Sequence, residues 1–161
     1  MTVSGFLVRS VLLLAVLSAP LYVALSQFGY FEPFLFPLHM AQAGTTTVGK
    51  HTYGPYPDEK TLHALKAKGI TAVIALLDPA LVYEKSLLER ERENAAKSGI
   101  QVYNFPMDSN KPADFPQNAK ALAGIRDLMS KKQEAQMYVH CYLGQHRARM
   151  TLRAMEYGVI N

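Results

Sequence analysis

The stretch Met137-Tyr-Val-His-Cys-Tyr-Leu-Gly-Gln-His-Arg-Ala-Arg149 decides the fold. Its apolar start, residues 137–139, predicts a buried strand, and residues 148–157 have the composition of a helix. A loop with Gly144 at its bend joins the two. Backbone N–H groups in such a loop and the dipole of the following helix both favour an anion. The stretch therefore predicts a phosphate-binding loop.

Two reactive side chains lie at the ends of this loop. The positive field that binds an anion also favours the thiolate form of Cys141, which is the nucleophilic form. Five residues separate Cys141 from Arg147, which allows both side chains to face one anion. The planar guanidinium matches phosphate oxygens in a way that lysine does not. The alternative interpretation is a buried cysteine at a strand end, followed by a surface arginine.

At these residues the chain resembles the cysteine-dependent protein phosphatases, and among them the dual-specificity and tyrosine-phosphatase-like group. The resemblance implies a cysteinyl-phosphate mechanism without metal or cofactor, in which the thiolate attacks phosphorus and the arginine holds the phosphate oxygens. It also implies that the His before the Cys orients the loop and that the loop residues bind the phosphate. The signature stands here as His140, Cys141, Tyr142, Leu143, Gly144, Gln145, His146 and Arg147.

A phosphatase of this kind also needs a general acid that protonates the leaving oxygen. The loop over residues 106–115 offers two carboxylates, Asp108 and Asp114. The resemblance favours Asp108, because the family places an Asp on such a loop before the Cys, commonly with a Pro a few residues later, here Pro112. Asp114 is the alternative acid, and it also suits the N-cap of a helix beginning at Pro116.

Two departures from the family pattern bear on activity. The family usually has Ser or Thr after the Arg, where the hydroxyl helps the thiolate leave, and this chain has Ala148. Slower hydrolysis of the phospho-intermediate is therefore expected. The family fold normally continues with further helices, whereas this sequence stops at Asn161, so the domain is either truncated or lacks part of its core.

The first functional interpretation is a phosphatase for phosphotyrosine, phosphoserine or phosphothreonine in proteins. A phosphatase for a lipid or inositol phosphate is the runner-up, favoured by a membrane anchor that would hold the site near lipid. The loop lacks the Lys residues typical of phosphoinositide phosphatases, and His146 alone adds positive charge. A phosphate-binding pseudophosphatase is the third interpretation, and Ala148 favours it.

Apolar runs alternate with amphipathic stretches, which predicts an α/β fold with a mostly parallel central sheet flanked by helices. The loops that follow Leu77, Phe105 and Val139 should meet at one edge of that sheet. The alternating charges from Glu89 to Glu93 are interpreted as a solvated helix face. The expected strands lie near residues 47–53 and at 70–77, 100–105 and 137–139, and the expected helices at 57–69, 80–97, 116–131 and 148–157.

Residues 10–31 carry no charge. At about 1.5 Å per residue, a helix of that length crosses a hydrocarbon core of roughly 30 Å. The sequence thus predicts an N-terminal transmembrane anchor and linker over residues 1–43, and a catalytic domain over 44–161. A cleaved signal peptide is the alternative, with residues 41–43 as its small-residue site.

The anchor predicts a single-pass protein of a bacterial inner membrane. Arg9 before the span places the catalytic domain outside the cytoplasm by the positive-inside rule. A thiolate enzyme favours a reducing compartment instead, so the side stays open. The expected partners are a phosphorylated protein or a phospholipid, together with the membrane through the N-terminal helix. A net charge of +4 without a dense basic stripe excludes a nucleic-acid footprint.

Overall fold

A computed structural model describes residues 16, 18–23 and 44–157. In it, five strands form one mixed sheet in the order β1-β2-β5-β3-β4. Only β1 and β2 pair antiparallel, and the other three neighbouring pairs are parallel. The strands are β1 (Thr46–Val48), β2 (His51–Gly54), β3 (Ile70–Ala75), β4 (Gln101–Asn104) and β5 (Gln136–His140). The helices are α3 (Glu59–Ala67), α4 (Val82–Lys97), α5 (Pro116–Lys131) and α6 (His146–Tyr157).

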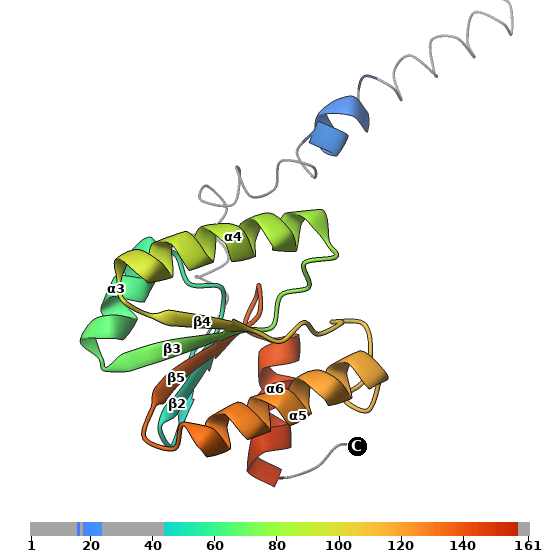
Figure 1. The fold of residues 1–161 in the computed structure, drawn as a ribbon. Coiled ribbons are helices and arrows are strands. Elements are labelled where there is room, and N and C mark those ends of the chain that lie inside the picture. Colours follow the sequence, from blue (N-terminus) through green and yellow to red (C-terminus); the bar gives the residue numbers. More distant parts are fainter. Residues whose placement is uncertain (1–15, 17, 24–43, 158–161) are drawn as a thin grey trace, which may run out of the picture.

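The helices cover the two faces of the sheet in pairs. Helices α3 and α4 lie on one face, and α5 and α6 lie on the other (Figure 1). Strands β3 and β5 lie at the centre, and their apolar side chains are buried on both faces. This explains the unbroken apolar runs in their sequences, since a strand covered on both faces does not alternate. The loop predicted to bind phosphate follows β5 and therefore lies between β2 and β3 at the centre of the sheet.

Three boundaries differ from the prediction in ways that have a local cause. The single strand expected near residues 47–53 is a hairpin, because Gly49 with a φ of +57° turns the chain between β1 and β2. Helix α3 begins after Asp58, whose side chain accepts a hydrogen bond from the backbone N–H of Thr61 at 2.7 Å. Helix α6 begins at His146, so Arg147 lies in its first turn.

The predicted membrane-spanning helix is wrong. Among residues 16, 18–23 and 44–157, no helix is long and apolar enough to cross a bilayer. The rest of the predicted span and the signal-peptide site at 41–43 lie outside the described residues. The predicted single-pass localisation and the predicted membrane contact both depend on that helix, so they are wrong as well.

Candidate active site

The loop that follows β5 is fixed to its two neighbouring strands. The backbone N–H of Leu76 donates to the carbonyl of His140 at 2.9 Å, and that of Tyr56 donates to the carbonyl of Tyr142 at 3.0 Å. Cys141, at the start of the loop, is 3% exposed. Tyr142 is half-buried, whereas the loop residues Leu143, Gln145 and His146 are exposed. The thiol therefore lies at the base of the loop and the later loop residues lie at its rim.

Gly144 is required at the bend for two independent reasons. Its φ is +70°, a left-handed conformation that side chains disfavour. A Cβ atom there would also lie 2.5 Å from the carbonyl carbon of Gly54 and 2.5 Å from the nitrogen of Pro55. The loop is thus pressed against the end of β2, and only glycine allows this approach.

Arg147 is 5% exposed and connects the ends of several elements. Its Nη1 donates to Oε2 of Glu84 at 2.8 Å, to the carbonyl of Leu76 at 2.9 Å and to the carbonyl of Met107 at 3.2 Å. Its Nη2 donates to Oε1 of Glu84 at 2.5 Å. One guanidinium therefore fixes helix α4, the end of β3 and the loop after β4 to the start of α6.

These contacts leave one side of the Arg147 guanidinium unused. Glu84 occupies the end of the guanidinium that lies between Nη1 and Nη2. The Nε–H is buried and has no acceptor among the described residues, and Nη2 has one acceptor for its two N–H groups. Nε–H and the neighbouring N–H of Nη2 form a parallel pair of donors, which suits two oxygens of one phosphate.

Arg147 keeps its positive charge although its side chain is buried. Burial alone would lower the pKa of Arg147, but the hydrogen bonds and charge of Glu84 outweigh it, with smaller contributions from Cys141 and Tyr83. The pKa of Arg147 therefore lies above its ordinary value.

His140 forms a second buried polar pair, with a glutamate of helix α4. Its Nε2 lies 2.8 Å from Oε1 of Glu91, and both side chains are wholly buried. The imidazole lies parallel to the ring of Tyr138 and edge-on to that of Tyr56. Burial, and then the charges of Glu91 and Cys141, raise the pKa of Tyr138 above its usual range. These contacts hold the His140 ring in one orientation beside Cys141.

The loop that contains Asp108 is held by one buried side chain, Asn118 of helix α5. Asn118 Oδ1 accepts from the backbone N–H of Asp108 at 2.8 Å. Its Nδ2 donates to the carbonyls of Asp108, Lys111 and Pro112 at 3.1, 3.0 and 2.9 Å. The preceding residue, Met107, is the one whose carbonyl contacts Arg147. Asp108 is therefore the residue next to the guanidinium contact.

The two candidate acids differ in their surroundings. Asp108 is half-buried, and its Oδ1 accepts from the backbone N–H of Asn110 at 2.8 Å. Asp114 is exposed, and it does not cap helix α5, since the N-cap residue is Phe115 and makes no side-chain cap bond. The suggested capping role of Asp114 is therefore wrong.

Three residues of the site were missed by sequence reasoning: Glu84, Glu91 and Asn118. The alternating charges of 89–93 were read as a solvated face, but Glu91 is wholly buried against His140. The sequence did contain a signal for the two glutamates. Residues 84, 87, 88, 91 and 95 recur at helical spacing and form one buried stripe of α4. A glutamate that lies in a stripe of Leu and Ala is buried, and a buried carboxylate needs a polar partner. Asn118 leaves no comparable signal.

We expect Asn118→Ala to lower the free energy of unfolding by about 1–3 kcal/mol, because it leaves several loop groups without partners. Urea denaturation followed by circular dichroism measures the change. Asn110→Ala is the matched control, since Asn110 is exposed and only its backbone N–H bonds the loop. Equal stability of the two variants would contradict the role of Asn118.

No protein-family model and no curated protein sequence matches this chain. Among solved structures, a DUF442 protein of Shewanella putrefaciens CN-32, provisionally named a phosphatase, aligns with a TM-score of 0.57 at 16% identity, over 73% of this chain and 71% of its own. P. aeruginosa TpbA in complex with phosphotyrosine aligns with a TM-score of 0.47 at 14% identity, over 71% of this chain and 78% of its own.

This chain has the cysteine-dependent phosphatase fold. The recognition made from His140, Cys141 and Arg147 is therefore confirmed at the level of the fold. In this structure the phosphatase-like loop follows the central strand β5, at the carboxyl end of the parallel strands. Ligands of open α/β sheets bind at that end.

Proposed function

We propose that this protein is a cysteine-dependent phosphatase that hydrolyses phosphate monoesters through a cysteinyl-phosphate intermediate. The observation that carries the proposal is the unused pair of donors on Arg147. A buried N–H group without a partner is costly, and a bound phosphate offsets that cost. Arg147 lies in the first turn of α6, and Cys141 lies six residues before it, at the start of the same loop.

In the first step of the proposed mechanism, the Cys141 thiolate attacks phosphorus in line with the leaving oxygen. The S–P bond forms as the P–O bond to the alcohol breaks, and Asp108 gives its proton to the departing oxygen. Arg147 binds two of the three remaining phosphate oxygens, and the backbone N–H groups of residues 142–146 bind the third. Catalysis then rests on positioning and on stabilising charge in the transition state.

In the second step the ionised Asp108 takes a proton from water. The water oxygen bonds to phosphorus, the S–P bond breaks and the Cys141 thiolate and inorganic phosphate are released. His140, held by Glu91, positions the loop and touches no reacting atom in this scheme. The catalytic part is proposed to be residues 44–161, and phosphorylated proteins are the proposed substrates, with a lipid or inositol phosphate as the alternative.

Hydrolysis of p-nitrophenyl phosphate by the full chain tests the proposal. Wild type should turn over, and Asp108→Asn should lower kcat by about 10²–10⁴-fold because the leaving group departs unprotonated. Asp114→Asn is the matched control and should retain most of the activity. A slow Asp114→Asn variant beside a normal Asp108→Asn variant would move the acid to Asp114. Absence of turnover by folded wild type would refute the phosphatase.

One observation favours a phosphate-binding protein with little turnover. Ala148 is wholly buried and has no hydroxyl. The next hydroxyl along α6 is that of Thr151, which donates to the carbonyl of Arg147 at 2.9 Å and lies 3.6 Å from the sulfur of Met107. It is therefore already engaged. In this interpretation the phosphocysteine forms and its hydrolysis is slow.

Ala148→Ser should consequently raise the steady-state kcat by about 2–10-fold, the effect of one added hydrogen bond to the leaving thiolate. Stopped-flow release of nitrophenol measures both steps: wild type should show a burst followed by slow turnover, and the variant a smaller burst. Ala154→Ser is the control, because Ala154 is also buried on α6. A linear wild-type time course with no gain in Ala148→Ser would contradict a slow second step.

A further inference from the structure

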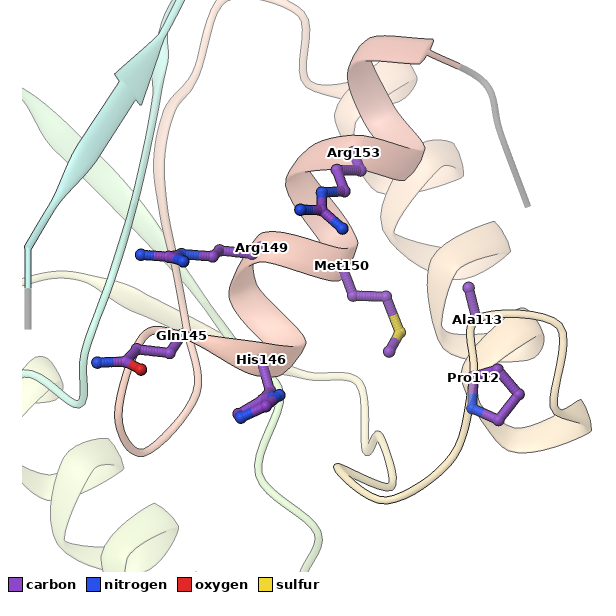
Figure 2. A pocket seen from close by; sticks show the side chains of 7 residues that line it. All are labelled: Pro112, Ala113, Gln145, His146, Arg149, Met150 and Arg153. Carbon is purple, nitrogen blue, oxygen red and sulfur yellow. The ribbon is translucent and has the colours of Figure 1, made fainter. Parts of the chain in front are cut away.

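A cavity of about 400 Å³ lies beside the phosphate loop, between helix α6 and the Asp108 loop. It shares Gln145 and His146 with the phosphate loop. Figure 2 shows Met150 projecting from α6 toward Pro112 and Ala113 on the opposite wall. The cavity is therefore continuous with the rim of the candidate active site and has an apolar wall on the side of the acid loop.

The α6 side of this cavity is basic. His146, Arg149 and Arg153 line it, and all three are exposed (Figure 2). Their spacing of three and four residues places them on one face of the helix. None of the described residues that line the cavity is acidic. Within the described part of the chain, neither arginine makes an ion pair or a side-chain hydrogen bond, although Glu156 lies only three residues after Arg153.

Three features of α6 are electrostatically unfavourable. Arg149 and Arg153 stand at i and i+4, where like charges repel. The first turn of α6 contains basic residues and no acidic residue, although the helix dipole there favours negative charge. The two arginines also lack a neutralising partner among the residues described. A bound anion relieves all three, and such conflicts between local rules and structure concentrate at functional sites.

The position of the basic face limits how far a second anion lies from the first. Arg147, proposed to bind the reacting phosphate, belongs to the same helix. At about 1.5 Å of rise per residue, the Cα atoms of Arg149 and Arg153 lie about 3 and 9 Å farther along the helix axis. The cavity that they line also includes Gln145 and His146 of the phosphate loop, so a group bound there lies beside the reacting phosphate and can belong to the same substrate molecule.

We propose that this cavity is a second anion site, formed by Arg149 and Arg153 with His146, and that it binds a second phosphate group of the substrate. The proposal rests on the phosphatase function above and adds to it a substrate class, phosphate esters that carry two phosphates. Two arginines match phosphate oxygens through their planar forks. The carbon frame that joins the phosphates contacts Met150, Pro112 and Ala113.

The test compares matched pairs of substrates on the full chain. One pair is inositol 1-phosphate and inositol 1,4-bisphosphate, and the other is a phosphotyrosine peptide with and without a phosphoserine two residues away. Wild type should prefer the doubly phosphorylated member of at least one pair by about fivefold or more in kcat/KM. This preference should shrink at high ionic strength, because the arginines are exposed. The pair that shows it identifies the source of the second phosphate.

The variant Arg149→Gln/Arg153→Gln should abolish the preference, measured as the ratio of kcat/KM within a pair. The control Lys60→Gln/Arg92→Gln removes two exposed charges from α3 and α4 on the opposite face of the sheet and should keep it. Turnover without preference, or a preference that survives in the arginine variant, would overturn the second site and leave the phosphatase intact.

Calorimetric titration of the same proteins with pyrophosphate separates the two proposals. If no ester is hydrolysed, the phosphatase function fails, and the titration then decides the anion site by itself. Pyrophosphate binding that weakens about fivefold or more in Arg149→Gln/Arg153→Gln, and not in the control, supports the site. Equal affinity in the two variants, or no binding by wild type, overturns it.

Discussion

Glu84→Ala should lower the free energy of unfolding by about 3–5 kcal/mol, because it leaves the buried charge of Arg147 without its partner. The side chain of Glu84 is 1% exposed and that of Arg147 is 6% exposed. Glu84 Oε2 also accepts from the backbone N–H of Asp78 at 2.5 Å, so the loop after β3 loses its anchor too. Urea denaturation followed by circular dichroism measures the loss.

Glu89→Ala is the matched control for this prediction. Glu89 lies on the same helix, and its ion pair with Lys85 is exposed at 4.0 Å. Exposed pairs of this kind contribute between about 0 and 1 kcal/mol. If the two variants are equally stable, Glu84 does not hold a buried arginine. Phosphatase activity should fall in Glu84→Ala as well, since the orientation of Arg147 depends on this carboxylate.

Cys141→Ser should lower the turnover of p-nitrophenyl phosphate by about 10⁴-fold or more, since removing the nucleophile of a covalent mechanism removes most of the rate. Serine has nearly the same shape as cysteine, so the buried site keeps its packing. The melting temperature should therefore stay near that of wild type, and the variant should still bind vanadate. Turnover within tenfold of wild type would exclude Cys141 as the nucleophile.

The part of the fold around the phosphate loop was predictable because its signal is local. The stretch from Met137 to Arg149 contains a strand, a glycine bend and a helix start in sequence order, and the structure has all three. Helix α5 was also predicted at its observed bounds, since Pro116 fits the first turn of a helix and the apolar spacing that follows it is regular.

The supporting residues were not predictable in the same way, because their partners are distant in the sequence. Glu84 meets Arg147 sixty-three residues later, and Glu91 meets His140 forty-nine residues later. A charged residue on a helix is most often solvated, so the alternating charges around Glu91 favoured the wrong interpretation. Asn118 forms hydrogen bonds with backbone groups of the Asp108 loop. No residue type in that loop indicates that these backbone groups need a side-chain partner.

The predicted anchor rested on composition, because residues 10–31 carry no charge and are numerous enough to cross a bilayer as a helix. No helix among the described residues is long and apolar enough to do so. Residues 10–15, 17 and 24–31 of that stretch lie outside the described residues.

Acid-quench mass spectrometry of the full chain, during turnover of p-nitrophenyl phosphate, tests the central claim most directly. It reports whether a phosphoryl group becomes covalently attached to the protein and to which residue. A phosphoryl group on Cys141, absent from Cys141→Ser and more abundant in wild type than in Ala148→Ser, is the predicted result. Hydrolysis that proceeds with the group on another side chain, or in Cys141→Ser at the wild-type rate, would contradict a cysteinyl-phosphate mechanism.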